Sequence, residues 1–192
     1  MKLYQTLITL SVFSLLISCG ENVEKTDSKE TKVEEVKVDA PEGWKTTSSD
    51  IFSIQHPEDW TADMEGKMGT KLFLFAPPED SKDLFNENIN LMSEKLPNKS
   101  IDLDMYVEAS EKQINQFITD AKILTSKRVK MNGKEYQNVS YTGTQGELNL
   151  RFEQYYTIED GEAFIVTFTC KTDTYEKYKE VGSKILQSFQ LR

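Results

Sequence analysis

The sequence is poor in the side chains from which most active sites are built. Its 192 residues include one histidine, two cysteines, nine glycines and five prolines. With a single histidine, a metal site with several histidine ligands cannot form, and a Ser-His-Asp site can form only around His56. Basic residues are also scarce, because 23 Lys and Arg face 32 Asp and Glu, giving a net charge of −9. This balance argues against a nucleic-acid partner, whose phosphates repel an acidic surface.

The first apolar run is too short to span a bilayer, which takes roughly 20 apolar residues. It follows Lys2, extends from Leu7 to Ile17 and stops at Ser18-Cys19. This ending resembles the bacterial lipobox, in which a cysteine after a small residue receives the lipid, although Ile17 is bulkier than the usual residue there. We therefore expect residues 1–18 to be a lipoprotein signal peptide and Cys19 to be the lipid attachment site, carrying palmitate or a similar acyl chain. The alternative is a secreted protein with an incidental cysteine.

The next segment, residues 19–43, combines the cysteine expected to carry the lipid with a polar stretch that contains no aromatic residue. Its few valines cannot bury enough surface to offset the entropy of ordering, so the sequence predicts a disordered acidic tether. Lipid on Cys19 would leave Cys170 without a partner, and no disulfide is expected.

The folded part begins near Trp44, where β-like alternation and turn signals replace the polar composition. Leu72–Phe75 is apolar throughout, which is typical of a strand buried on both faces. Turn signals at Asn132-Gly133, Gln145-Gly146 and Asp160-Gly161 separate β-rich runs, and Asn-Gly is the strongest short hairpin signal. These features predict strands near 51–56, 71–76, 88–92, 122–131, 134–143, 147–158 and 163–171.

Two segments have helical periodicity. Apolar side chains recur on one stripe between Leu103 and Ile118, and Asp102 is placed to cap the helix. A second helix is predicted from about 174 to 188, begun by a capping box of Asp173 and Glu176. The expected inward residues are Leu103, Tyr106, Val107, Ser110, Ile114, Phe117 and Ile118 in the first helix, and Tyr178, Val181, Ile185, Leu186 and Phe189 in the second.

The strand predicted at 163–171 is apolar on both faces, so it must be central and covered on both sides. Two amphipathic helices can supply the two covers. The predicted fold is therefore α+β, an α/β/α sandwich with a central, mainly antiparallel sheet covered by helices on both faces. Its predicted domain occupies residues 44–192.

The segment Phe52-Ser53-Ile54-Gln55-His56-Pro57-Glu58-Asp59-Trp60 resembles the opening strand and corner of the PsbP-like superfamily, which includes PsbP, Mog-type and DcrB-like proteins. His56 stands where tyrosine is commoner. Further similar elements follow in the same order over about 45–192, and the resemblance implies a non-catalytic fold with varied partners. They are Ile89-Asn90-Leu91, Leu103-Asp104-Met105-Tyr106, the hairpins at Gly133 and Gly146, Ala163–Phe168, and Ser188-Phe189.

Candidates for chemistry are few. His56 is the one possible general base, and no Gly-x-Ser-x-Gly nucleophile motif accompanies it. Cys170 lies on an apolar strand face and is expected to be buried and unreactive. Acidic pairs occur at Glu58/Asp59, Glu79/Asp80 and Glu159/Asp160, which we interpret as solvated turns, with calcium binding as the alternative. One basic spot, interpreted as a solvated hairpin face, contains Lys127, Arg128, Lys130 and Lys134.

These observations favour a lipid-anchored, non-enzymatic binding or assembly module of the bacterial cell envelope, attached through Cys19 to a membrane outside the cytoplasm. We expect a protein partner, a monomeric domain, and no cofactor, metal or nucleic acid. Catalytic residues are expected to be absent, and the ligand-binding residues stay unassigned. Two alternatives stay open, a carrier of a small apolar ligand held between sheet and helix, and an envelope hydrolase that uses His56.

Overall fold

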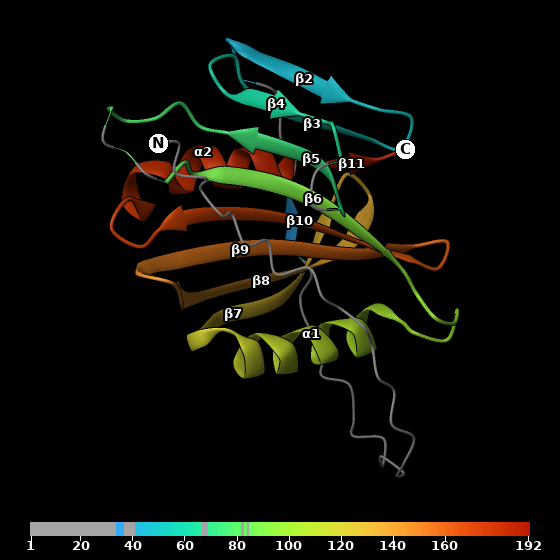
Figure 1. Ribbon diagram of the computed structural model, residues 1–192. Helices are drawn as coiled ribbons and strands as arrows, with labels where there is room; N and C mark the ends of the chain where they lie inside the picture. Colours follow the sequence, from blue (N-terminus) through green and yellow to red (C-terminus); the bar gives the residue numbers. More distant parts are fainter. Residues whose placement is uncertain (1–33, 37–40, 67–68, 82, 84) are drawn as a thin grey trace.

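The computed structural model describes residues 34–36, 41–66, 69–81, 83 and 85–192 (Figure 1). Within these ranges the chain forms two helices, and neither is long and apolar enough to cross a membrane. The helices are α1 (Leu103–Phe117) and α2 (Tyr175–Gln187). The strands are β1 (Glu34–Val36), β2 (Trp44–Ser48), β3 (Phe52–Pro57), β4 (Thr61–Asp63), β5 (Thr70–Phe75), β6 (Asn88–Lys95), β7 (Thr119–Met131), β8 (Lys134–Gln145), β9 (Leu148–Glu159), β10 (Glu162–Lys171) and β11 (Gln190–Leu191).

Eight strands form one large sheet in the order β1-β7-β8-β9-β10-β6-β5-β4 (Figure 1). Each neighbouring pair is antiparallel except β1 and β7, which run parallel. The predicted meander from β7 to β10 is confirmed. At the first hairpin Asn132 and Gly133 have φ of 51° and 80°, the positive values that a type I′ turn requires.

β10 lies between β9 and β6, as its double apolar character predicted. Val166, Phe168 and Cys170 belong to the core on one face of the sheet. Ala163 belongs to the core on the other face, and Ile165 packs against that second core. The sheet separates the two cores, so successive side chains of β10 point alternately into one core and the other.

The prediction that helices alone cover the sheet is wrong for one face. α1 packs over the β7–β9 part of one face, whereas on the opposite face α2 shares the cover with a second sheet of order β11-β3-β2. Phe52 and Ile54 project from β3 into the core below and are fully buried. Because β3 alternates, it has one apolar face to bury and finds strand partners on both sides. The fold is α+β and richer in sheet than a sandwich covered by helices.

Both predicted helices form, but only one cap is the predicted one. The Asp102 carboxylate accepts a hydrogen bond from the Met105 N–H at 2.9 Å, which confirms it as the N-cap of α1. The capping box of Asp173 and Glu176 is wrong, because α2 starts after Thr174 and has no side-chain cap hydrogen bond. The Thr174 hydroxyl instead donates to Glu87 at 2.6 Å.

Packing confirms most of the predicted core. Trp60 is 3% exposed and belongs to the cluster that contains α2 and β3, so it is a structural residue. Phe117 was expected to point inward, yet it is 60% exposed as the last residue of α1. Its neighbour Ile118 takes the inward position, since a Cβ added at Gly143 would lie 2.2 Å from its Cγ2.

Candidate functional site

The predicted signal peptide and Cys19 lie outside the described residues, so the lipid site stays a prediction. Residues 19–43, the predicted tether, are described only in part. Glu34–Val36 form β1, which pairs with β7, and residues 41–43 lead into β2. Through β1, the chain is therefore held to the large sheet before residue 44, the predicted start of the domain.

His56 occupies a buried position near the end of β3. Its Nδ1 lies 2.9 Å from the Pro57 carbonyl, which can only accept, so Nδ1 carries the proton and donates. Its Nε2 then accepts from the Thr47 hydroxyl at 2.8 Å. Burial, with a smaller contribution from the Lys45 charge, holds the pKa of His56 below its usual 6.5. The hydroxyl lies at the distance of a nucleophile–base pair, but a backbone carbonyl stands where a catalytic histidine usually has a carboxylate.

Cys170 is buried in β10, as predicted, and has no disulfide partner within the described chain. Burial, assisted by the Glu87 charge, raises the pKa of the Cys170 thiol to about 12. Only a thiolate reacts readily, so the folded protein holds this sulfur in its unreactive form.

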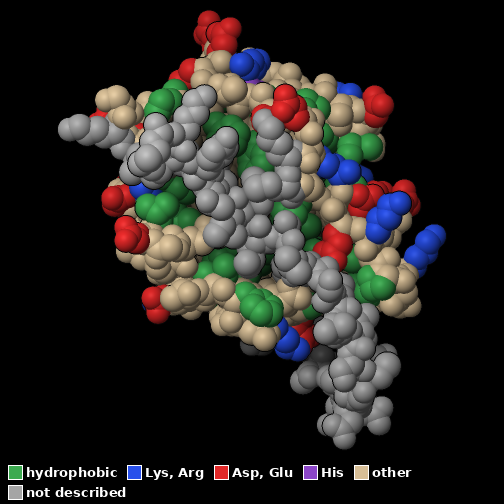
Figure 2. Space-filling view, in the orientation of Figure 1, with side chains coloured by type: hydrophobic (Ala, Val, Ile, Leu, Met, Phe, Trp, Pro, Cys, Tyr) green, Lys and Arg blue, Asp and Glu red, His purple; other side chains and the backbone are tan. Residues whose placement is uncertain are grey.

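The predicted acidic pairs do not come together. Glu79 accepts a hydrogen bond from Lys177 at 2.8 Å, and Glu159 accepts one from Lys134 at 2.6 Å. Among the described residues, no group of three or more His, Cys, Asp or Glu side chains could hold a metal ion. On the face shown in Figure 2, acidic and basic side chains are interspersed around the rim.

A polar cluster that the sequence did not reveal ties α2 to the sheet. The Arg151 guanidinium lies over the Tyr175 ring, 3.8 Å from its centroid. Glu153, two residues along β9, accepts hydrogen bonds from Ser183 at 3.3 Å and from Asn138 at 3.4 Å. Burial raises the pKa of the Glu153 carboxyl. Each of these residues has a structural partner. They come from strands and a helix that are far apart in the chain, so no sequence motif indicates the cluster.

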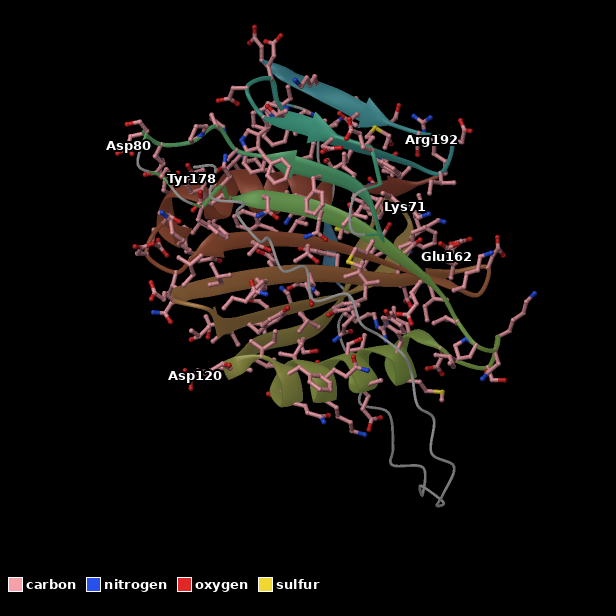
Figure 3. The ribbon with its side chains drawn as sticks, viewed as in Figure 1. Lys71, Asp80, Asp120, Glu162, Tyr178 and Arg192 are labelled. Carbon is pink, nitrogen blue, oxygen red and sulfur yellow. The ribbon has the colours of Figure 1, made fainter. Side chains whose placement is uncertain are left out.

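An open hollow of about 610 Å³ lies where β8 and β10 end and β9 begins. Asp120, one of its lining residues, lies beside the end of α1, at the opposite end of the sheet from Lys71 and Glu162 (Figure 3). Most of its lining residues are polar or charged, although they also expose apolar atoms, and it lies at the strand ends rather than between the sheet and a helix. The lining residues are Asp120, Thr142–Thr144, Glu147–Leu150 and Lys171–Asp173.

The outer edge of β7 is the longest stretch of strand edge that no described strand pairs. β8 pairs with one side of β7 along its length, whereas β1 pairs with the other side only at Val129, Lys130 and Met131. The stretch Leu124–Lys127 is exposed. An unpaired edge presents backbone N–H and C=O groups that another strand can bind. This edge therefore offers a binding surface made of backbone as well as side chains, and β7 carries three members of the basic spot, Lys127, Arg128 and Lys130.

Two members of the basic spot are already engaged by side chains of the same domain. Arg128 forms an ion pair with Asp104 of α1, and Lys134 pairs with Glu159. Lys130 is exposed and lies opposite Glu35 in the β1–β7 register. The spot thus combines internal ion pairs with a position on the strand edge.

No protein-family model matches the sequence, and no curated protein resembles it significantly. Solved structures do resemble it. The cyanobacterial PsbP of Synechocystis, CyanoP, has a TM-score of 0.57 at 15% identity, and the match covers 78% of this chain and 93% of that one. PA94 of Pseudomonas aeruginosa, a protein of unknown function and putative regulator, has a TM-score of 0.56 at 10% identity, covering 78% and 97%.

A third similar structure is LpqN of Mycobacterium tuberculosis, which is involved in cell envelope biogenesis. It has a TM-score of 0.57 at 12% identity, and the match covers 73% of this chain and 82% of LpqN. At these identities the comparisons establish the fold, and the expected resemblance is confirmed at that level. The described domain, with its large sheet, two helices and small second sheet, has the PsbP-like fold.

Proposed function

We propose that this chain is a lipid-anchored module of the bacterial cell envelope, whose PsbP-like domain binds a protein partner and performs no catalysis. The observation that carries the proposal is a lipobox-like sequence ending at Cys19 ahead of a PsbP-like domain. The similarity to LpqN, a protein involved in cell envelope biogenesis, supports the same compartment for this chain.

The state of the two possible catalytic side chains supports binding over catalysis. Both ring nitrogens of His56 are used in hydrogen bonds within the domain, and the sulfur of Cys170 is buried. Among the described residues, the β7 edge and the hollow at the strand ends are two exposed features with capacity to bind.

Carriage of a small ligand is a second candidate, and the hollow is the observation that favours it. Small-ligand sites are mostly apolar concave pockets of roughly 300–1,000 Å³. The hollow has a volume in this range, but it is open and lies at the strand ends, whereas a carried apolar ligand was expected between the sheet and a helix.

The anchor is tested by fractionating cells that express the wild type or the Cys19→Ser variant. The variant is exported with a signal segment that the general signal peptidase removes, so that no apolar leader stays attached. We expect the wild type in the membrane fraction and the variant in the soluble fraction, because acyl chains supply most membrane affinity for an acidic protein. Retention of the variant in the membrane would refute the lipid anchor.

The binding role is tested by crosslinking in intact cells, with the lipid-modified chain as bait. The matched control carries residues 1–43 fused to an unrelated domain, so that anchor and tether are the same. A partner that crosslinks to the full chain and not to the control supports the proposal. An identical set of crosslinked proteins for both baits would contradict it.

A further inference from the structure

We propose that Arg151 has two alternative positions beside the start of α2, one stacked on Tyr175 and one paired with Glu153, and that ionisation of Glu153 selects between them. The start of α2 is then held to the sheet more firmly in acid than at neutral pH. The inference goes beyond the proposed binding function and assigns a pH-sensitive contact inside the domain. A switch of this kind needs a change of charge and an element with two arrangements.

The position of Arg151 is the first observation. Its guanidinium lies over the Tyr175 ring, 3.8 Å from the centroid, and one of its terminal nitrogens donates to the Ser140 hydroxyl at 3.3 Å. Its Nε is buried and has no hydrogen-bond partner within the described chain. A buried donor without a partner is costly, so the present position leaves Arg151 incompletely satisfied. This side chain would gain a hydrogen bond by moving toward an acceptor.

The second observation is a carboxylate within reach of Arg151. Glu153 follows two residues later on β9, so both side chains project from the same face of the sheet, roughly 7 Å apart along the strand. The hydrogen bonds of this partly buried carboxylate come from the neutral groups of Ser183 and Asn138, at 3.3 and 3.4 Å. Strong hydrogen bonds to a carboxylate are shorter, about 2.5–2.9 Å. An ionised Glu153 is therefore poorly compensated, and Arg151 is the cation whose charge acts on it.

The protonation of Glu153 decides which position Arg151 takes. Burial raises the pKa of the Glu153 carboxyl above its usual 4.5. A neutral carboxyl does not attract a guanidinium, so Arg151 stays on the Tyr175 ring, the position that the structure shows. An ionised carboxylate attracts it, because opposite charges interact strongly where water is partly excluded. The contact with Tyr175 is thus lost as the pH rises through the pKa of Glu153.

The surrounding groups do not change charge over the same pH range. The other titratable groups around Glu153 are Tyr155 on β9, Cys170 on β10, Tyr175 and Lys179 on α2, and Lys127 on β7, opposite Asn138. Burial raises the pKa of both tyrosines and of the thiol, so these three groups stay neutral between about pH 4 and pH 8. Lysines keep their charge over this range. Within this cluster, Glu153 is therefore the group that titrates.

The contact between Arg151 and Tyr175 lies beside the hollow at the strand ends. Thr142, which is opposite Arg151 on β8, lines the hollow. Lys171–Asp173 line it as well, and they lead directly into α2. Loss of the contact with Tyr175 therefore loosens one wall of the hollow, and the order of this wall depends on pH.

NMR of the full mature chain, titrated from about pH 4 to pH 8, tests the switch. The reporters are the amides of Lys177 and Tyr178, which donate to the Thr174 carbonyl in the first turn of α2. We expect their signals to show a transition with a midpoint above 4.5. Their hydrogen exchange, corrected for its intrinsic pH dependence, should be about threefold faster at neutral pH than in acid, which is the effect of one lost cation–π contact.

Two substitutions of buried carboxyl groups locate the titrating group. Glu153→Gln should abolish the transition and keep exchange slow at neutral pH, because a neutral amide does not attract Arg151. The matched control is Glu94→Gln. Glu94 is a second carboxyl whose pKa is raised by burial, and it accepts a hydrogen bond from Tyr106 of α1 instead of contacting α2. A transition that persists in Glu153→Gln, or that is lost equally in Glu94→Gln, would overturn the assignment.

Tyr175→Leu distinguishes the switch from a purely structural role of Glu153. Without the ring, Arg151 loses its competing position and is more available to ionised Glu153. The midpoint should therefore fall by about 0.5 pH unit, since the coupling between the two contacts is reciprocal. An unchanged midpoint would show that Tyr175 and Glu153 do not compete for Arg151.

The Nε–H signal of Arg151 gives a second readout, in the wild type itself. It is one of three arginine signals in this chain and is identified by its absence from Arg151→Lys. We expect it to move downfield as the pH rises through the same midpoint, because Nε–H then gains a carboxylate acceptor. A signal that does not move would refute the paired position of Arg151, whatever the variants show.

Discussion

Gly182 sets the distance between α2 and the large sheet. A Cβ at this position would lie 2.6–2.8 Å from three ring atoms of Phe168, and Phe168 is itself 1% exposed. A ring packed on all sides cannot move aside without disturbing its own neighbours. The helix therefore lies against the sheet through the one residue type that has no side chain.

Gly182→Ala is expected to destabilise the protein. Alanine raises helix propensity by about 1 kcal/mol, but overpacking a close contact costs about 1–3 kcal/mol, so the net loss should be near 1 kcal/mol. Gly182→Val should cost more. Urea denaturation measures both, with Glu180→Ala on the exposed face of α2 as the control. A gain in stability for Gly182→Ala would show that α2 can shift away from the sheet.

Because His56 is the single histidine of the chain, its pKa can be measured by NMR without resonance assignment. Its pKa lies below the usual 6.5 in the folded chain because burial disfavours the charged ring. Between the folded and the unfolded pKa of His56, the unfolded chain binds more protons than the folded chain. The neutral ring therefore makes its full contribution to the free energy of unfolding above about pH 6.5, and this contribution falls as the pH is lowered through the window.

NMR of the imidazole C–H signals in an untagged protein should give a titration midpoint below that of a histidine peptide. In the same window, the free energy of unfolding should fall less steeply for His56→Gln than for the wild type. A midpoint at or above the peptide value would contradict the buried, neutral ring.

For single residues, the sequence predicts which side chains are buried better than it predicts where two elements pack in close contact. Cys170 and Trp60 are buried as expected, because alternation and corner position are visible in the sequence. Gly182 carries no such signal, since a glycine in a helical window looks like a weak helix position. Phe117 fitted the helical stripe, but the helix ends there and the stripe continues in Ile118.

The two helices start in different ways. The Asp102 carboxylate caps α1, whereas Thr174 at the start of α2 donates its hydroxyl to Glu87, which is 1% exposed. The first arrangement satisfies an N–H group of the helix, and the second supplies a donor to a buried carboxylate. The sequence indicated the Asp102 cap, but it gives no sign that Thr174 donates to Glu87, because that contact joins residues far apart in the chain.

Asp102→Ala is therefore expected to cost about 1 kcal/mol, the usual value of a lost N-cap. Asp102→Asn should lose only a fraction of this, because its side-chain oxygen can accept the same hydrogen bond. Thermal or urea unfolding measures the difference, with Asp104 left intact for its ion pair with Arg128. Equal stability of all three chains would mean that water caps the helix as well as Asp102 does.

Strand lengths depend on partners that lie far away in sequence. The alternation predicted a strand ending at Met92, whereas β6 continues to Lys95. Its polar end is held by β10, with Ser93 opposite Phe164 and Lys95 opposite Glu162. Backbone pairing alone extends the strand, so hydrophobic patterning cannot indicate its end.

Over the whole molecule, local order was predictable and long-range pairing was not. The hairpin series from β7 to β10 follows from turn residues, and both helices follow from periodicity. The small sheet joins β2 and β3 to the two-residue strand β11 near the other end of the chain, and β1 joins the outer edge of β7. Neither pairing leaves a signal in the pattern of a single segment. The hollow likewise collects residues from several strand ends, and no spacing in the sequence announces it.

Truncation tests how the leading segment contributes to the fold. Chains that start at Val33 and at Pro41 differ in whether β1 is present. We expect their melting temperatures to agree within a few degrees, because β1 adds three residues to an edge. Amides of Val129–Met131 should exchange faster in the shorter chain. A large drop in melting temperature would show that β1 is an integral part of the domain.

The pairing of β1 with β7 also sets how far from a membrane the domain can work. If Cys19 carries the proposed lipid, the stretch from Cys19 to Glu34 of β1 spans at most about 50 Å when fully extended. Measured instead to Trp44 at the start of β2, the same limit for an extended chain is about 85 Å. With a lipid on Cys19, the pairing of β1 with β7 would therefore keep the domain closer to the bilayer than an anchor reaching only to β2 would.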